Sequence, residues 1–256
     1  MKRDSDKIFW HKFDSFYESR LPLDNVENIL EIGVFKGDSI RYWREKYADS
    51  HIYGMDIIEE NIFWPKDDRI KYFRIDQSDI VSYRQCLSEV SRIFDVVIED
   101  GSHDPLHQKI SLMETLPYLR NGSIYILEDI HTSHHDHPLF KSRLQKINES
   151  LGLFKKKNED YYMTLQSLLH LEHFKRLNIS KSDIEDSINF NKSLFTIEEL
   201  KLLYDKVKKI EIFKRSILPD YCYSCYKNDF NYISLKCKCG ADLYSSSDSM
   251  TAILYF

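Results

Sequence analysis

No stretch of this sequence approaches the run of about 18 apolar residues that a membrane-spanning helix needs. The first twenty residues also lack the apolar core of a secretory signal peptide. The net charge of −5 at pH 7 argues against a protein that binds nucleic acid or a membrane over its whole surface. We therefore expect a cytoplasmic protein without a membrane partner.

Internal repeats and long disordered linkers are also missing, so the chain is predicted to fold around one main core. Its 256 residues are enough to bury one sizeable core with a small appendage. Hydrophobic residues make up 42% of the chain and charged residues 30%, as in ordinary globular proteins.

Short apolar runs recur along the first half of the chain, at residues 28–33, 51–57, 70–76, 94–100 and 123–129. The segments between them have helical spacing, and alternating strands and helices predict a parallel sheet covered on both faces. Residues 209–215 and 251–256 predict two more strands. The expected fold is an α/β protein with a doubly wound, seven-stranded, mostly parallel sheet.

Four regions follow from this pattern. We expect an N-terminal helix within residues 1–24 and a ligand-binding core at 25–140. Residues 141–209, which are polar and rich in Lys, Leu and Glu, are predicted to form a helical lid or insertion. Residues 210–256 would carry the last two strands with a cysteine-containing insertion between them.

A glycine turn follows the first predicted strand, in the segment "LEIGVFKGDSI". Gly33 and Gly37 there let a ligand approach the backbone and the helix amino end, but the third glycine of the dinucleotide fingerprint is missing, which argues against NAD. Asp56 ends the second strand, where a carboxylate can accept hydrogen bonds from ribose hydroxyls, and Asp76 ends the third. Each acid alone is more often a helix cap, but the two together behind a glycine turn favour an adenosine ligand.

The combination of "ILEIGVFKGDSI", "DQSD", "EDGSH" and "LEDIHTS" resembles the class I S-adenosylmethionine-dependent methyltransferases over residues 25–135. Within them it resembles the metal-dependent O-methyltransferases that modify macrolide sugars. The resemblance implies a methyltransferase with a Rossmann-like fold and an S-adenosylmethionine site. The residues expected at that site are Glu31, Gly33, Gly37, Asp56, Asp76, Gln77 and Asp100.

In a doubly wound methyltransferase sheet the fourth and fifth strands are neighbours, so the acids that end them should converge. Asp100 ends one strand, and Glu128 with Asp129 ends the other. Three carboxylates at one edge need a cation or protons to neutralise them, and oxygen ligands suit Mg²⁺, Mn²⁺ or Ca²⁺. The resemblance assigns Mg²⁺ to acids at these positions. Such an ion would orient a sugar or polyol acceptor and activate its hydroxyl, with Asp129 in the catalytic set.

A base must also take the proton of that hydroxyl, and His103 and His131 lie in the two loops that carry the acids. Either histidine could instead support the metal site, and His107 could face the core or the site. His134, His135 and His137 are expected to be solvated. The resembled enzymes carry a histidine near the last strands, whereas this chain has none after His173, so the base and the acceptor stay open.

Four of the five cysteines form the pattern C-x₂-C, eleven residues, C-x-C: Cys222, Cys225, Cys237 and Cys239. Four thiolates with this spacing predict a closed tetrahedral Zn²⁺ site of structural rather than catalytic type, in a zinc-ribbon-like insertion. Cys86 stands alone.

Two other functions remain open. Residues 201–239 contain nine Lys or Arg against four Asp or Glu, so a zinc ribbon there could bind RNA, as an RNA methyltransferase or a non-catalytic RNA-binding protein. A catalytically inactive scaffold is the third possibility. The absence of a dense basic and aromatic stripe argues against nucleic acid, and intact acids at the strand ends argue against the scaffold. We expect a small acceptor from surface-glycan or natural-product assembly, namely a sugar, a polyol or a nucleotide- or phosphate-linked form of either; a homo-oligomer is left open.

Overall fold

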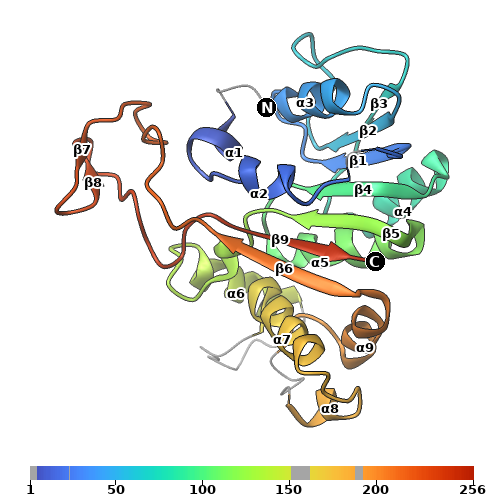
Figure 1. Cartoon of the computed structure of the whole chain (residues 1–256). Helices are drawn as coiled ribbons and strands as arrows, with labels where there is room; N and C mark the ends of the chain where they lie inside the picture. The colour runs from blue at the N-terminus through green and yellow to red at the C-terminus, as the bar shows by residue number, and fades with distance from the viewer. Residues whose placement is uncertain (1–4, 23, 151–161, 188–192) are drawn as a thin grey trace.

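The computed structural model describes residues 5–22, 24–150, 162–187 and 193–256, which fold around one seven-stranded sheet (Figure 1). Its strands are β1 (Asn28–Ile32), β2 (His51–Asp56), β3 (Ile70–Arg74), β4 (Phe94–Glu99), β5 (Leu119–Leu127), β6 (Lys209–Lys214) and β9 (Met250–Tyr255). They lie in the order β3-β2-β1-β4-β5-β9-β6. Neighbours from β3 to β5 pair in parallel, and β9 is antiparallel to both β5 and β6. The predicted seven-stranded, mostly parallel sheet is confirmed.

The central strands are apolar because both faces of the sheet are covered. Every residue of β4 is buried, and four consecutive residues of β2 are buried as well. A strand in such a sheet cannot alternate apolar and polar residues, which explains the continuous apolar runs in the sequence. β3 lies at the edge of the sheet and is only partly buried.

Helices form a layer on each face. Apolar side chains near α2 and on α3 pack on one face, and those of α4, α5, α7 and α9 pack on the other. Asp79 and Asp104 cap the first turns of α4 and α5 by accepting backbone hydrogen bonds. The helices are α1 (Asp6–Phe9), α2 (Asp14–Glu18), α3 (Asp38–Lys46), α4 (Ile80–Val90), α5 (Pro105–Thr115), α6 (Phe140–Ser150), α7 (Thr164–Arg176), α8 (Asp183–Ser187) and α9 (Ile197–Lys206), with short 3₁₀ turns η1 (Leu116–Tyr118) and η2 (Ile130–Ser133).

The region expected to be a helical lid, residues 141–209, contains α7, α8 and α9 and most of α6. Leu168 of α7 and Leu203 of α9 are fully buried in the same core as the sheet, and α7 packs beside β6. The described part of this region therefore extends one face of the sheet. Residues 151–161 and 188–192 of the expected lid, and 1–4 and 23 of the expected N-terminal region, lie outside the described residues. None of the described helices has the length and apolar character needed to cross a membrane.

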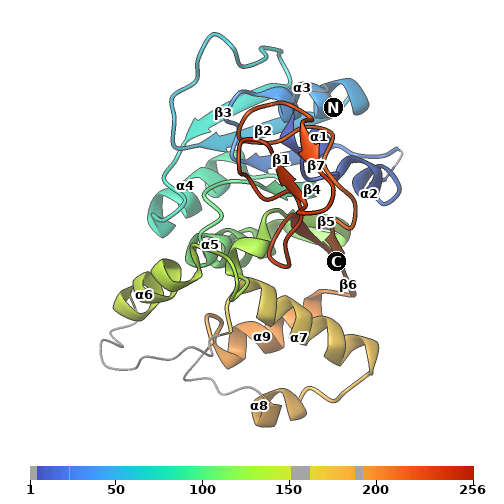
Figure 2. The ribbon, with the colours of Figure 1, turned by 90° about the vertical axis from the view of Figure 1, so that its left-hand side faces the viewer.

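The insertion between β6 and β9, residues 216–249, is called the cysteine arm below. It contains only two short strands, β7 (Phe230–Asn231) and β8 (Lys236–Cys237). Because β6 points the same way as β1 to β5, its carboxyl end delivers the arm to the edge of the sheet where ligands bind in this class of fold. Figures 1 and 2 show the arm at that edge, beside α1.

Candidate active site

The glycine turn after β1 lies tightly against the loop after β4. Gly33 has φ of 91°, and a Cβ atom built on it would overlap the backbone carbonyl of Asp100. The backbone N–H of Asp100 in turn donates to the carbonyl of Ile32 at 2.8 Å. A side chain at position 33 would separate the two loops, so this position requires glycine.

Asp56, at the end of β2, braces the same turn. Its Oδ2 accepts hydrogen bonds from the backbone N–H groups of Val34 and Phe35 at 2.7 and 2.9 Å, and its Oδ1 accepts one from Ile58 at 3.0 Å. These bonds fix the carboxylate where it faces the space above β1 and β2.

A cavity of about 480 Å³ opens along the carboxyl ends of the parallel strands. This volume lies within the range of about 300–1,000 Å³ that is usual for small-molecule sites. One end is lined by the glycine turn and the acids after β2 and β3, and the other by the loops after β4 and β5. The predicted site residues that line it are Gly33, Asp56, Asp76, Gln77, Asp100, His103, Glu128 and Asp129.

Gln77 connects the two ends of this cavity. Its Nε2 donates to Glu99 Oε1 at 2.5 Å and to Ser111 at 2.7 Å, and its Oε1 accepts from the backbone of Ser102 at 3.0 Å. Burial raises the pKa of Glu99 to about 7. Asp76 beside it is exposed and accepts hydrogen bonds from Ser78, which lower its pKa.

Two predicted cofactor residues do not line the cavity. Glu31 is completely buried in β1, and burial raises its pKa to about 8. Gly37, with φ of 73°, precedes the first residue of α3 and packs against Trp64 and Pro65. In this structure both residues shape the walls behind the turn.

The three predicted metal-binding acids converge, and a lysine lies between two of them. Lys7 of α1 is 4% exposed; its Nζ donates to Asp100 Oδ2 and, at 2.5 Å, to Glu128 Oε2. Burial alone would lower the pKa of Lys7, but the carboxylates of Asp100 and Glu128 outweigh it and raise the pKa well above its usual value. Burial raises the pKa of Glu128 and of Asp100.

The donor set that remains open to a cation is Asp100, His103 and Asp129. Each offers one ligand atom, and these atoms lie within 4.8 Å of one another. Asp129 Oδ1 and Glu128 Oε1 are buried without a hydrogen-bond partner among the described residues, as expected of oxygens that await a cation. His103 and Asp129 both have positive φ, 54° and 52°, and His103 Nε2 lies 3.6 Å from Asp129 Oδ2. The residues present therefore fit a divalent ion.

Of the two predicted catalytic histidines, only His103 lines the cavity. Its Nε2 lies 3.6 Å from Asp129 Oδ2. His131 does not line it; its Nδ1 accepts from the backbone of Met250 at 3.3 Å, and burial lowers its pKa to about 4. Together with His11, these histidines outweigh the effect of burial on Asp129 and lower the pKa of that carboxyl.

Lys7, His11 and Tyr223 are site residues that the sequence patterns do not reveal. His11 lines the cavity, with Nε2 3.8 Å from Asp129 Oδ1, and Tyr223 reaches it from the cysteine arm. None lies at the end of a predicted strand, and the C-x₂-C motif around Tyr223 predicts a metal site rather than a residue of the cavity. Only the fold brings residues 93 to 121 positions apart into contact.

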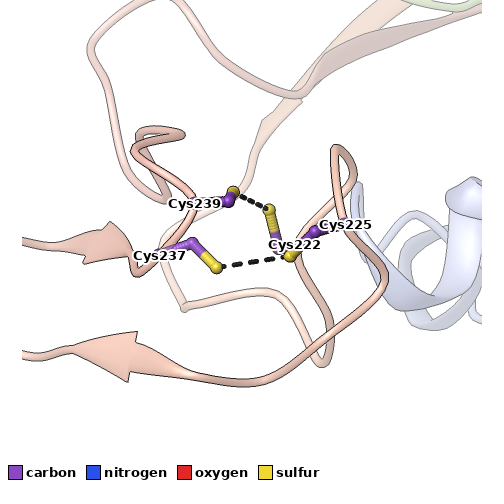
Figure 3. A group of neighbouring side chains, drawn as sticks. All are labelled: Cys222, Cys225, Cys237 and Cys239. Atoms are coloured by element: carbon purple, nitrogen blue, oxygen red, sulfur yellow. Dashed lines mark hydrogen bonds between the residues drawn. The ribbon is translucent and has the colours of Figure 1, made fainter.

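The four cysteines form a compact cluster, which Figure 3 shows. Cys222 Sγ lies 3.6 Å from Cys239 Sγ, Cys225 Sγ lies 3.5 Å from Cys237 Sγ, and all four sulfurs lie within 4.8 Å of one another. All are free thiols. Tetrahedral Zn²⁺ with bonds of about 2.3 Å separates its sulfur ligands by roughly 3.8 Å, so the arrangement fits this ion.

Over about half of its length, the chain is similar to curated O-methyltransferases. The 8-demethyl-8-alpha-L-rhamnosyl tetracenomycin-C 2'-O-methyltransferase of Streptomyces olivaceus is 30% identical over 143 residues, 52% of this chain and 37% of that enzyme. The mycinamicin VI 2''-O-methyltransferase of Micromonospora griseorubida is 33% identical over 138 residues, 49% of this chain and 33% of that enzyme. No family model matches the chain.

Among solved structures, the MycE methyltransferase of the mycinamycin biosynthetic pathway, in complex with Mg and SAH, is 28% identical, with a TM-score of 0.48 over 64% of this chain and 42% of that chain. The chain spans about a third of the length of the curated relatives it matches. The relatives confirm the resemblance to sugar O-methyltransferases that the sequence motifs indicate.

Proposed function

We propose that this chain is a metal-dependent S-adenosylmethionine O-methyltransferase that acts on a hydroxyl of a sugar or polyol. The observation that carries the proposal is the cavity, because it joins the glycine turn and Asp56 at one end to the carboxylates and His103 at the other. The methyl donor and the acceptor would therefore meet between β1 and β5. The similarity to sugar O-methyltransferases supports this chemistry.

The residues after β1, β2 and β3 would bind the cofactor, which supplies a sulfonium methyl group for in-line transfer to the acceptor oxygen. The backbone N–H groups of Val34 and Phe35 already hold the Asp56 carboxylate in place. It can therefore accept a hydrogen bond from a ribose hydroxyl without moving. Asp76 lies beside the expected adenine, and Gln77 holds the loop after β4 in place. Glu31 and Gly37 support this half from behind.

Asp100 and Asp129 would hold a divalent ion such as Mg²⁺, with Glu128 as the third predicted ligand. When bound, the ion lowers the pKa of the acceptor hydroxyl and orients it. The Lys7 ammonium donates hydrogen bonds to both Asp100 and Glu128, and its positive charge reduces the repulsion between these carboxylates. Asp129 keeps His103 oriented toward the acceptor side.

His103 is our candidate for the base. It lines the cavity, whereas His131 is buried behind Asp129 and is better placed to support that carboxylate. The acceptor proton would pass to the imidazole of His103, whose backbone carbonyl is held by Thr132 at 3.0 Å and by Arg143.

Zn²⁺ is our candidate ion for the cysteine cluster, where four protein ligands leave no open position for catalysis. RNA binding by the arm is not favoured. Two of its lysines, Lys236 and Lys238, pair with Asp242 and Asp229 at 3.3 and 3.0 Å instead of presenting free charge.

The direct test is transfer of labelled methyl from S-adenosylmethionine to a panel of rhamnosyl glycosides, nucleotide-linked sugars and free polyols, with and without Mg²⁺. We expect label in at least one sugar class and only with the ion. A sheared RNA sample serves as the competing acceptor. Label in RNA with none in any sugar would replace the proposal with the RNA methyltransferase alternative.

A further inference from the structure

The cysteine arm has too little apolar core to keep its shape unaided. Its buried hydrophobic core is limited to Cys222, Cys237 and Leu243 among the described residues, and β7 and β8 are two residues each. Ile233 at its tip is 98% exposed. Small units of this kind usually depend on a metal or disulfides, and the cysteines here form no disulfide.

The same arm packs on residues 5–13, called the N-terminal segment below. The ring of Phe9 lies 6.2 Å from that of Tyr221 and 5.9 Å from that of Tyr226. The ring of Trp10 lies 6.0 Å from that of Tyr223. Three aromatic residues within or next to the first cysteine pair therefore contact two neighbouring aromatic residues of the segment.

Polar contacts reinforce this packing. The backbone N–H of Asp220 donates to the carbonyl of Phe9 at 2.8 Å, and the Asp220 carboxylate pairs with Lys12 at 2.6 Å. The guanidinium of Arg215, at the base of the arm, lies 4.7 Å from the ring centre of Trp10. The arm thus holds the segment by its backbone as well as by its side chains.

The N-terminal segment cannot hold itself in place, because α1 has only four residues and isolated helices of that length are unstable. Yet it delivers Lys7 to Asp100 and Glu128, and His11 to Asp129. Tyr223, between the first two cysteines, lines the cavity itself. The cofactor end of the cavity, by contrast, rests on β1 to β3.

We propose that Zn²⁺ bound by Cys222, Cys225, Cys237 and Cys239 fixes the N-terminal segment over the cavity, so that metal loading of the arm assembles the acceptor side of the active site. This inference rests on the proposed function only in that it takes this end of the cavity to bind the acceptor. The zinc content, the hydrogen exchange of the N-terminal segment and the dependence of that exchange on zinc can all be measured without an acceptor. The zinc acts here as a remote positioning element rather than as a participant in methyl transfer.

The test compares the full-length wild type with Cys225→Ser, and with Cys86→Ser as the matched control outside the cluster. Elemental analysis measures zinc, hydrogen exchange measures protection of residues 5–13, and calorimetry measures S-adenosylmethionine binding. We expect Cys225→Ser to lose zinc and to exchange residues 5–13 at least about tenfold faster. Its cofactor affinity should stay within about threefold of wild type.

Tyr223→Ala removes the ring contact with Trp10 without removing a zinc ligand, and so tests the contact separately from the metal. Tyr232→Ala, at an exposed position of the arm, is its control. Tyr223→Ala should keep one zinc per chain and still loosen residues 5–13, whereas Tyr232→Ala should do neither. Full protection of residues 5–13 in zinc-free Cys225→Ser, or a wild type purified without zinc, overturns the inference. Absent cofactor binding in zinc-loaded wild type would instead count against the proposed function alone.

Discussion

Lys7 Nζ lies 2.5 Å from Glu128 Oε2, although 121 positions separate the two residues in the chain. The same ammonium group also reaches Asp100, and it is nearly completely buried. A cation of this chain therefore already offsets part of the negative charge at the strand ends. A buried charge cluster of this kind is tolerated only when its members stay paired.

Lys7→Met tests whether the buried carboxylates depend on the Lys7 ammonium for their pairing. Without the ammonium, Asp100 and Glu128 would face each other unpaired, so we expect a loss of about 3–5 kcal/mol in the free energy of unfolding in chelator. Saturating Mg²⁺ should recover part of the loss, because the ion can take over the neutralising role. Denaturant unfolding with EDTA and with Mg²⁺ measures both effects.

Lys71→Met is the matched control for Lys7→Met. Lys71 pairs with Glu89 at 3.0 Å on the exposed edge of the sheet, and such surface pairs contribute about 0–1 kcal/mol. Mg²⁺ should not affect its stability. Equal stability of the two variants in EDTA would show that the pairing of Lys7 is not important.

Gly33→Ala tests the close approach of the turn to the loop after β4. Gly122 also has positive φ, 95°, but a Cβ there would meet nothing within 4 Å. Gly122→Ala should therefore cost only the backbone strain of about 1–2 kcal/mol. Gly33→Ala should cost clearly more and also weaken S-adenosylmethionine binding, as calorimetry and denaturant unfolding would show. Equal costs would mean that the overlap with Asp100 relaxes freely.

Asp56→Ala should weaken S-adenosylmethionine binding by about 1.5–3 kcal/mol, roughly 10- to 150-fold, because it removes a charged acceptor for ribose. Asp56→Asn keeps an oxygen for the N–H groups of Val34 and Phe35 and should lose less. Asp49→Ala, which removes an exposed acid before β2, is the control. Calorimetry with unchanged affinity for Asp56→Ala would remove Asp56 from the cofactor site.

The strands and the acids at their ends were predictable because a parallel sheet leaves a local record in the sequence. Buried strands read as continuous apolar runs, and the residue after each run points to one common edge. Asp56, Asp100 and Asp129 were found in this way. The sequence does not show, however, that Asp56 accepts hydrogen bonds from the backbone of the glycine turn.

Lys7, His11 and Tyr223 were not predictable, for a physical reason. Each reaches the cavity from a short segment whose position depends on packing against another part of the chain, 93 or more positions away for Lys7. Polar residues in such segments look like ordinary solvated side chains. For residues 141–209, helical periodicity predicts helices but does not tell which face of a fold they cover, so the packing of α7 and α9 against the sheet could not be predicted.

Glu31 should make stability depend on pH. Its pKa rises from 4.5 to about 8 in the folded protein because it is buried, so the folded state keeps a proton that the unfolded state releases between those pH values. Stability should therefore fall as pH rises from about 4.5 to about 8. Glu31→Gln removes this loss and should become more stable than wild type at pH 9, by an amount on the order of a few kcal/mol.

Thermal unfolding from pH 5 to pH 9 gives the comparison for Glu31. Glu45→Gln, an exposed position on α3, is the control and should track the wild type at every pH. A constant difference between Glu31→Gln and wild type across the range would show that Glu31 is charged throughout.

Asp129→Asn tests the metal and the chemistry together. Asn tolerates the positive φ of 52° at this position and keeps the shape of the side chain, so the fold should persist. Turnover should fall by at least about a hundredfold while S-adenosylmethionine stays bound, because the cofactor end of the cavity is untouched. Chelation of the wild type under conditions that leave the proposed zinc of the cysteine arm in place should reproduce this, and Mg²⁺ or Mn²⁺, but not added Zn²⁺, should restore transfer at the oxygen-rich site. Asp136→Asn, an exposed acid seven residues on, should stay active. If both the chelated wild type and Asp129→Asn transfer methyl at the normal rate, the carboxylates only position loops and His103 must act without a metal.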